Sequence, residues 1–382
     1  MEKYNVVIIG AGPAGSFLAN KLKNKGYKVL IIEKKKFPRY KSCAGGLSKK
    51  AYDILYNENI NIKKVIEKNV KNFLYVRNNK LIKVKTDEEL IYMTYRSKLD
   101  NFLLKNAVDN KTIFFKDNIS IKKINIKNSI VTFLQEKKEY NISYDILVGA
   151  WGHNIRLNKI ISLYPFDYFS LSSSWEGPSS KKFLKYSNEY FLTHFNKKYP
   201  DFLCYIFPKK DLITAGIFTS KYPFPSFRKN VWNDFLNFWN LDKNIKPKYA
   251  IIPIRDFSKP IAEKKILLVG DAAGLADPFT GEGMYYAIIS SIIAANNIEK
   301  FFKIKNFNLA ENYNMDINIK LFDVLKWGSY FRYIFNKIPN FSFWFGSETS
   351  WGNYVSKSFI TGKIKYNEIQ KIIKYPFLKI FG

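Results

Sequence analysis

Short apolar runs and amphipathic segments alternate along the first part of the chain. Val6–Ile9 and Val29–Ile32 are continuous apolar runs, typical of central parallel strands that are covered on both faces. Between them, residues 16–25 suit a helix that stops at Gly26. Residues 145–149 and 266–269 have the pattern of two more buried strands. The alternation predicts an α/β fold with a parallel sheet.

Other stretches follow different periods. We expect a helix over 51–69, two strands over 73–85 with a turn at Asn78-Asn79, and a helix within 94–108. Residues 113–144 alternate as a small meander, and aromatic-rich strands dominate from about 157 to 260. The apolar stretch Met284–Ala295 is too short to cross a bilayer and is expected to be a buried helix.

A glycine-rich turn follows the first strand. Gly10, Gly12 and Gly15 fit G-x-G-x-x-G, and Glu33 ends the next strand. Strand, glycines, helix, strand and acid in this order predict a dinucleotide site, with the pyrophosphate at the helix N-terminus and Glu33 on a ribose. A tight turn without a ligand is the structural alternative. The residues predicted to bind here are Gly10, Gly12, Pro13, Ala14, Gly15, Glu33 and Lys34.

A second fingerprint is "VGDAAGLADPFTGEGMYYA". Gly270-Asp271 ends a buried strand, and Gly281-Glu282-Gly283 leads into a helix from about Met284. Small residues let a backbone approach a ligand, although Gly-Asp-Ala-Ala alone could be a packing device. Together with the first site, this segment favours FAD over NAD as the bound cofactor.

These fingerprints are far apart in the sequence, so one domain interrupts the other. We expect a Rossmann-type FAD-binding domain from residues 1–50, 90–156 and 265–300, and a mainly antiparallel β-sheet substrate domain from 51–89 and 157–264. Residues 301–382 are expected to form a helical C-terminal region.

The net charge of +30 is spread along the chain and accompanies no nucleic-acid-binding signature. It predicts no nucleic-acid partner, but it is compatible with weak peripheral attraction to an anionic membrane. The two cysteines are too few for a disulfide framework, which favours the cytoplasm. His153 and His194 have no metal-ligand spacing, so no metal is expected.

Several segments, in the same order, resemble the geranylgeranyl reductase family, within the flavoprotein group that includes para-hydroxybenzoate hydroxylase. They are "GAGPAGSFLANKL", "FPRYKSCAGGLS", "YRSKLDNFLL", "GDAAGLADPFTGEGMYYA" and "ITGKIKY" near 360–366. The resemblance implies that Arg39 and Arg96 lie near the cofactor, that Asp271 holds its ribityl-pyrophosphate region, and that Gly281–Gly283 face the isoalloxazine.

The resemblance also changes the reading of Cys43. A free cysteine is usually an inert core residue, and Cys204 is expected to be one. In the family, the matching cysteine lies close to the flavin, which implies that Cys43 shapes the cavity or assists protonation, with Ala44 and Gly45 beside it.

Three departures from the family's pattern concern the cofactor or the substrate. Trp151 stands where an acid is usual, which weakens any nicotinamide-binding role there. Leu203 and Tyr205 replace the Tyr and Trp of Tyr-x-Trp-x-Phe-Pro-Lys, and Ala44 replaces a glycine. The candidate substrate contacts are Tyr205, Phe207 and Pro208, with Trp175 and Phe191 as further aromatic candidates.

The resemblance implies an FAD-dependent reductase that acts on carbon–carbon double bonds of a polyprenyl lipid or diphosphate. NAD(P)H or a ferredoxin-type protein would be the reductant. An aromatic hydroxylase or halogenase of the same fold is an alternative, although the halogenase signature Trp-x-Trp-x-Ile-Pro is absent. A non-catalytic, membrane-associated flavin-binding sensor or scaffold is another.

Overall fold

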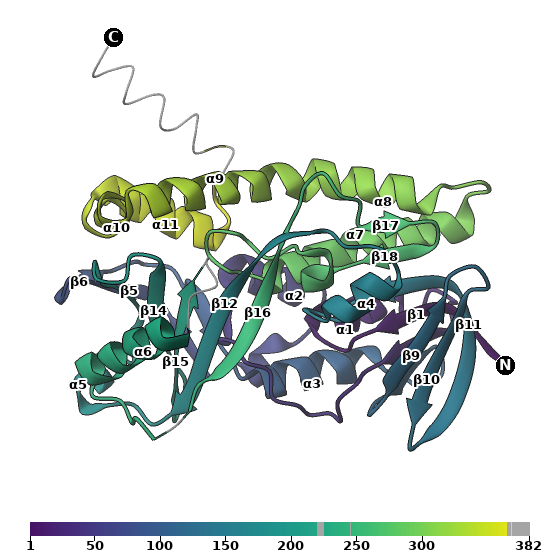
Figure 1. The fold of residues 1–382 in the computed structure, drawn as a ribbon, viewed down its shortest axis with the longest axis horizontal. Helices are drawn as coiled ribbons and strands as arrows, with labels where there is room; N and C mark the ends of the chain where they lie inside the picture. The colour runs from purple at the N-terminus through teal and green to yellow at the C-terminus, as the bar shows by residue number, and fades with distance from the viewer. Residues whose placement is uncertain (220–224, 245, 365–367, 369–382) are drawn as a thin grey trace, which may run out of the picture.

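The computed structural model describes residues 1–219, 225–244, 246–364 and 368. Two sheets stand side by side, and a row of helices runs along one side of both (Figure 1). The end of "ITGKIKY" and the last part of the expected C-terminal helical region lie outside the described residues.

The first sheet has eight strands and a parallel centre. Its main path runs β17-β18-β11-β1-β2-β8, in which β11, β1, β2, β8 and β18 pair in parallel, while β9 and β10 extend β11 as an antiparallel meander. The apolar runs at Val6–Ile9 and Val29–Ile32 are fully buried here, as predicted. The strands are β1 (Glu2–Ile9), β2 (Val29–Ile32), β8 (Ile113–Lys116), β9 (Ser120–Asn125), β10 (Ile130–Gln135), β11 (Lys138–Gly149), β17 (Ala262–Glu263) and β18 (Ile266–Leu268).

Helices cover this sheet because their apolar faces match its buried surface. α1 (Pro13–Leu22) packs between α3 (Arg96–Ala107) and α7 (Met284–Lys303), and α8 (Leu309–Ile317) packs on α7 and β17. α7 contains the apolar stretch expected to be a buried helix, and most of its first three turns are buried. α4 (Ile155–Ile160) follows β11. No helix among the described residues is long and apolar enough to cross a membrane.

The second sheet has seven strands in the order β16-β12-β15-β14-β13-β5-β6, and only β13 and β5 pair in parallel. α5 (Lys181–Leu184) and α6 (Pro225–Trp239) lie against it, and Trp175 and Trp239 are at most 1% exposed in the core between them. The strands are β5 (Asn72–Arg77), β6 (Lys80–Val84), β12 (Phe166–Gly177), β13 (Tyr190–Phe195), β14 (Phe202–Pro208), β15 (Ile213–Thr219) and β16 (Lys248–Arg255).

A three-stranded sheet lies between these parts. β7 (Ile91–Met93) pairs with β3 (Gly46–Ser48) and β4 (Lys68–Val70). The predicted helix over 51–69 was too long, because α2 (Lys49–Asn57) ends before Asn59, whose φ of 58° is left-handed. A 3₁₀ turn, η1 (Ile62–Val65), and β4 follow. The domain boundaries stay a prediction.

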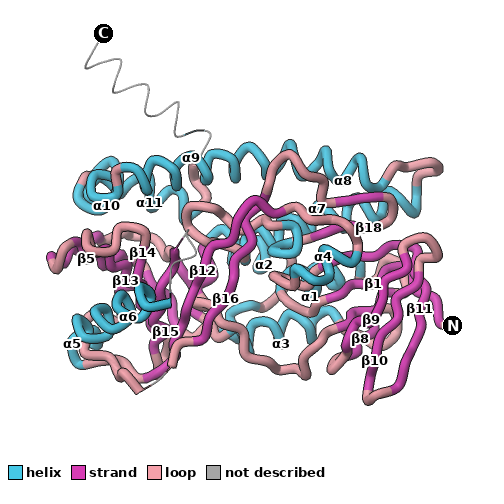
Figure 2. The backbone as a smooth tube through the Cα atoms, viewed as in Figure 1, coloured by secondary structure: helices cyan, strands magenta, loops and turns pink. Residues whose placement is uncertain are grey.

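The C-terminal helices connect the two large sheets. A π-helical segment, η3 (Asn318–Phe322), leads into α9 (Asp323–Lys337), α10 (Pro339–Glu348) and α11 (Ser350–Thr361). Pro339 begins α10, where its missing N–H does no harm. α10 contacts β5 and β6, whereas α11 contacts α2. Figure 2 shows these helices as one layer over the strands.

Candidate functional site

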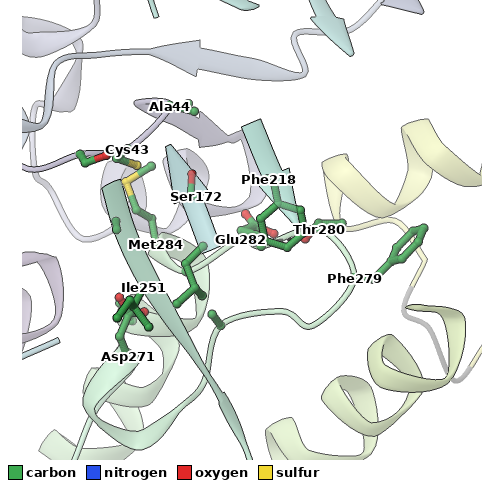
Figure 3. Close-up of a pocket in the computed structure, with 18 of the residues that line it drawn as sticks. Cys43, Ala44, Ser172, Phe218, Ile251, Asp271, Phe279, Thr280, Glu282 and Met284 are labelled. Atoms are coloured by element: carbon green, nitrogen blue, oxygen red, sulfur yellow. Dashed lines mark hydrogen bonds between the residues drawn. The ribbon is translucent and has the colours of Figure 1, made fainter. Parts of the chain in front are cut away.

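A cavity of about 1760 Å³ runs between the first sheet, the second sheet and the C-terminal helices. Sites for one small molecule usually measure about 300–1,000 Å³, so there is room for two ligands end to end. One end is lined by the glycine turn and Glu33, the other by aromatics of the second sheet and of α9–α11. Figure 3 shows its middle, where Cys43, Met284, Ser172 and Ile251 surround the space.

The three glycines of the first turn have different physical reasons. Gly10 has a φ of 112°, and a Cβ there would lie 2.3 Å from the Ala150 carbonyl oxygen. A Cβ at Gly15 would lie 1.9 Å from the Gly10 oxygen, so helix and strand need glycine to pack. At Gly12 the only neighbour within 4 Å is the Arg39 guanidinium, at 3.6 Å. Gly12 therefore keeps open the space in which the start of α1 can meet a pyrophosphate.

Glu33 is buried at the end of β2, beside this turn. Its Oε2 accepts a hydrogen bond of 3.0 Å from the Ala11 N–H, and its Oε1 accepts one of 3.1 Å from the Lys35 N–H. A carboxylate has about four lone-pair positions, so Glu33 can fix the turn and still accept bonds from a ribose.

Two arginines line the cavity next to this acid. Arg96 donates to both oxygens of Asp100, at 2.7 and 2.9 Å, and Arg39 lies 3.1 Å from the same carboxylate. Burial disfavours the charge of Arg96, but Asp100 and the nearby Cys43 outweigh it and raise the Arg96 pKa. Since Asp100 is completely buried, it holds both guanidinium groups at the cavity wall.

The loop from Cys43 to Gly46 crosses the middle of the cavity. Cys43, Ala44 and Gly46 line the cavity. Gly45 is not part of the lining, and its backbone has a left-handed φ of 75°. A Cβ at Gly45 would lie 2.2 Å from the Thr94 oxygen, and one at Gly46 would lie 2.5 Å from the Phe207 ring. Because neither position has room for a Cβ, glycine lets the loop pack directly against Thr94 and Phe207.

The second fingerprint forms the opposite wall. The 3₁₀ turn η2 (Gly270–Ala273) places Asp271 at the cavity, and Gly281, Glu282, Gly283 and Met284 line it at the start of α7. Asp277, which the sequence analysis did not select, is completely buried and accepts bonds from the Phe279 and Thr280 amides at 2.8 and 2.9 Å. Burial raises its pKa.

Glu282 connects this loop to α2. It accepts a hydrogen bond from Ser48 and forms an ion pair of 2.8 Å with Lys50. The Lys50 ammonium also lies 4.6 Å from the ring centre of Phe359 in α11, so the loop, α2 and the C-terminal helices are tied together.

Lys41 and His153 form a pair at the cofactor end that sequence reasoning missed. Lys41 Nζ lies 3.2 Å from His153 Nδ1. Burial lowers the pKa of Lys41, and burial with the neighbouring Lys41 lowers the pKa of His153 to about 4. The imidazole is therefore neutral at pH 7.

The proposed substrate contacts divide between the two faces of the second sheet. Tyr205, Phe207 and Phe191 line the cavity, as does Leu203. Trp175, named as a further aromatic candidate, belongs to the core under α6, because its strand turns that side chain to the other face. Cys204 is also buried there, as expected of a core residue. Trp151 lines the cavity and donates to Asn158 at 2.8 Å.

Four selected residues lie behind the cavity wall rather than on it: Gly15, Gly45, Pro208 and Gly270. Of the missed residues, Lys50 gave no signal, because lysines are scattered along the chain. Asp277 and Lys41 lie within the segments GDAAGLADPFTGEGMYYA and FPRYKSCAGGLS, but the interpretation of these segments did not assign them a role. Asp100 did give a signal, since it follows Arg96 by four residues on a predicted helix. In the described part of the chain, no cluster of His, Cys, Asp and Glu could hold a metal ion.

Comparisons with known proteins agree with this geometry. The FAD binding domain family matches residues 3–166. An uncharacterized protein of Methanosarcina barkeri is 31% identical over 79% of this chain and 76% of its own length. The digeranylgeranylglycerophospholipid reductase of Methanococcus vannielii is 25% identical over 80% of each chain.

Among solved structures, a geranylgeranyl bacteriochlorophyll reductase-like protein from Thermoplasma acidophilum superposes with a TM-score of 0.74 at 21% identity, covering 95% of this chain and 90% of that one. This likeness confirms the fold: a parallel FAD-binding sheet, a mainly antiparallel second sheet and C-terminal helices. With the two fingerprints facing one cavity, the chain belongs to the geranylgeranyl reductase family of FAD-dependent oxidoreductases.

Proposed function

We propose that the protein reduces carbon–carbon double bonds of a polyprenyl lipid or diphosphate. The observation that carries the proposal is the aromatic end of the cavity, which continues from Cys43 and Met284 to the C-terminal helices. A long apolar chain fits such a lining, and relatives are named for geranylgeranyl substrates. Aromatic residues that line the cavity include Phe73, Tyr75, Phe191, Tyr205, Phe207, Phe335, Phe343 and Phe345.

The first sheet would hold the cofactor. The start of α1 and Arg39 flank the space for the pyrophosphate, and Glu33 offers acceptor positions to the ribose. Asp271 and the loop Gly281–Met284 would lie along the ribityl and ring parts. Bound FAD, once reduced, supplies a hydride. NAD(P)H or a ferredoxin-type protein is the proposed reductant.

The second sheet and α9–α11 would exclude water and orient the double bond. Cys43 lines the cavity next to the buried Arg96, and its thiol is our candidate for delivering a proton to the second carbon or for shaping the space beside it.

The lipid could enter between α9 and α10. Ile338 and Phe341 line the cavity and are also 47% and 56% exposed, so they stand at its mouth. Tyr333 and Trp344 are exposed nearby, and Lys337 ends α9. Exposed aromatics beside a basic residue suit peripheral contact with an anionic membrane.

The test is anaerobic. The FAD-loaded protein is reduced with dithionite and incubated with geranylgeranyl lipids or geranylgeranyl diphosphate. The masses of the products are then measured by mass spectrometry. Gains of hydrogen pairs are expected. Stable reduced flavin with no product from either substrate would leave the aromatic hydroxylase and the flavin-binding scaffold as the remaining functions.

A further inference from the structure

Lys209 follows β14 and is a buried lysine, 2% exposed, that the site described above does not use. Its Nζ donates a hydrogen bond of 3.0 Å to the Ala44 carbonyl and another to Thr214 Oγ1, on β15. The same Nζ lies 5.2 Å from the ring centre of Tyr95. Among the described residues, no carboxylate forms an ion pair with it.

The residue acts on the loop that crosses the cavity. Ala44 lies between Cys43 and Gly45, and Lys209 itself does not line the cavity, so its bond draws the Ala44 carbonyl away from the ligand space. The ring of Phe207, two residues before Lys209, packs against the backbone of Gly46. The end of β14 therefore holds the loop at two points, one polar and one apolar.

Other contacts also restrain the loop: Gly46 begins β3 and pairs with Met93 of β7, and Ser42, just before Cys43, bonds Ser174 Oγ at 2.7 Å and the Lys248 carbonyl at 2.9 Å. Thr94 N–H donates 2.8 Å to the Gly45 carbonyl, and Gly45 N–H lies 3.5 Å from Cys43 Sγ. A buried ammonium that donates to a carbonyl forms a charge-assisted bond, which is about twice as strong as a neutral one. Lys209 therefore adds a charge-assisted restraint at Ala44, between the Ser42 bonds at one end of the loop and the β3–β7 pairing at the other.

We propose that Lys209 is a positioning residue, whose buried ammonium fixes the loop Cys43–Gly46 and thereby sets where the Cys43 thiol stands beside the flavin. The inference rests on the proposed function only in placing Cys43 at the flavin. It assigns the second sheet a role beyond substrate contact, because the same strand end that carries Phe207 also orients the cofactor-facing loop.

The charge of Lys209 can change within an accessible pH range. Burial lowers the pKa of Lys209 to about 8, while the neighbouring Glu176, Cys43 and Glu67 oppose this shift. Glu176 on β12 is paired in register with Thr214, and burial raises its own pKa. The ammonium is present below pH 8 and is lost as pH rises through 8, so the restraint on Ala44 weakens in that direction. Stability follows the opposite sign: an ammonium that is disfavoured by folding costs stability below pH 8, and this cost disappears as pH rises toward 10.5.

The experiment compares Lys209→Met, which removes the donor, and Lys209→Gln, which keeps a neutral donor, with wild type. Lys182→Met is the matched control, because Lys182 also donates to a backbone carbonyl, that of Phe238, on the far side of the second sheet. The first readout is the rate at which iodoacetamide alkylates Cys43, located by peptide mass spectrometry, with and without bound FAD. The second is the visible spectrum of bound FAD from pH 6 to 10.

At pH 7 we expect Cys43 in Lys209→Met to be alkylated faster than in wild type on the order of tenfold, the change that corresponds to losing one charge-assisted hydrogen bond. Both rates are expressed per thiolate, with the thiolate fraction of each protein taken from its own pH–rate profile, because removing a cation beside a thiol also lowers the amount of thiolate. The ratio of the Lys209→Met alkylation rate to the wild-type rate should fall toward one above pH 8, where the wild-type protein has lost its ammonium. Lys209→Gln should lie between them at pH 7, and the wild-type flavin spectrum should shift with a midpoint near pH 8 that both variants lack.

A ratio that stays near one at pH 7 in both variants, or one that does not change with pH, would overturn the proposal. If Lys209→Met does not fold, Lys209→Gln and the wild-type pH series still decide it. Neither readout uses a prenyl lipid, so this experiment and the test of the proposed function are independent. Lys209 can position the loop in a protein that reduces no prenyl lipid, and a protein that reduces prenyl lipids can have a loop that Lys209 does not position.

Discussion

Arg96 and Asp100 are joined by two hydrogen bonds, of 2.7 and 2.9 Å, at the wall of the cavity, and Asp100 has no exposed surface. Asp100→Ala would leave the buried Arg96 charge without its main partner. The expected loss in the free energy of unfolding is about 3–5 kcal/mol, which urea denaturation measures.

The control for this change is Asp53→Ala. Asp53 pairs with Lys49 at the same four-residue spacing, but its side chain is 43% exposed. Such pairs are worth about 0.3–0.5 kcal/mol. Equal losses in the free energy of unfolding of the two variants would show that burial does not determine how much the Arg96–Asp100 pair contributes to stability.

Gly12 and Gly15 should respond differently to substitution. Gly12→Val fills the open space near Arg39 without meeting the backbone, so the protein should fold and lose FAD. Gly15→Ala puts a methyl group into the Gly10 carbonyl and should lower the melting temperature instead. Flavin absorbance after purification and circular dichroism melting separate the two results. Full FAD retention by Gly12→Val would move the pyrophosphate away from this turn.

Glu33→Ala should weaken FAD binding by about 1–3 kcal/mol, since it leaves buried hydrogen-bonding groups unpaired. Fluorescence quenching of FAD gives the affinity. Glu33→Gln keeps an acceptor for the Ala11 amide and should lose less. If both variants bind as wild type does, the ribose is held elsewhere.

Cys43 should affect turnover more than folding. Its side chain lines the cavity and is only partly buried, so Cys43→Ala should keep FAD and a near-native melting curve. If the thiol delivers a proton, alkene reduction should fall by about 10²–10⁴-fold. Cys43→Ser keeps the size, so a role in shape alone would leave that variant active. Cys204→Ala, behind the sheet, is the control. Unchanged rates and products in Cys43→Ala and Cys43→Ser would make Cys43 a wall residue only.

Liposome flotation tests the proposed membrane contact. A double variant, Phe341→Ser with Trp344→Ser, removes two exposed aromatics from α10, whereas Phe343 between them is buried and is left intact. Binding to vesicles that contain anionic lipid should decrease in this variant. If wild type and the variant float equally, or if flotation does not depend on the content of anionic lipid, this surface is not the membrane contact.

The sequence by itself determined the nucleotide-binding elements, because their signals are local. A continuous apolar run, a glycine that must take a left-handed φ or admit a backbone, and an acid at a strand end are each dictated within a few residues. Gly10, Gly15 and the strands β1 and β2 follow from such rules. Asn78 and Asn79 likewise form the predicted turn, with φ values of 48° and 71°.

Only the tertiary structure decided what faces the cavity. Trp175 and Tyr205 are both aromatic residues on strands of one sheet, yet one lies under α6 and the other in the cavity, because the face of a strand depends on which partner covers it. Lys209 bonds Ala44 across 165 residues, and Lys50 joins Glu282 to α11. Lys209 ends the segment that matches Phe-Pro-Lys of the family's pattern, but that pattern does not say which atoms its ammonium binds, and no local pattern distinguishes Lys50 from the other lysines of a basic chain. Their role arises from burial, which removes water and leaves a few carbonyl, hydroxyl and carboxylate oxygens as their partners.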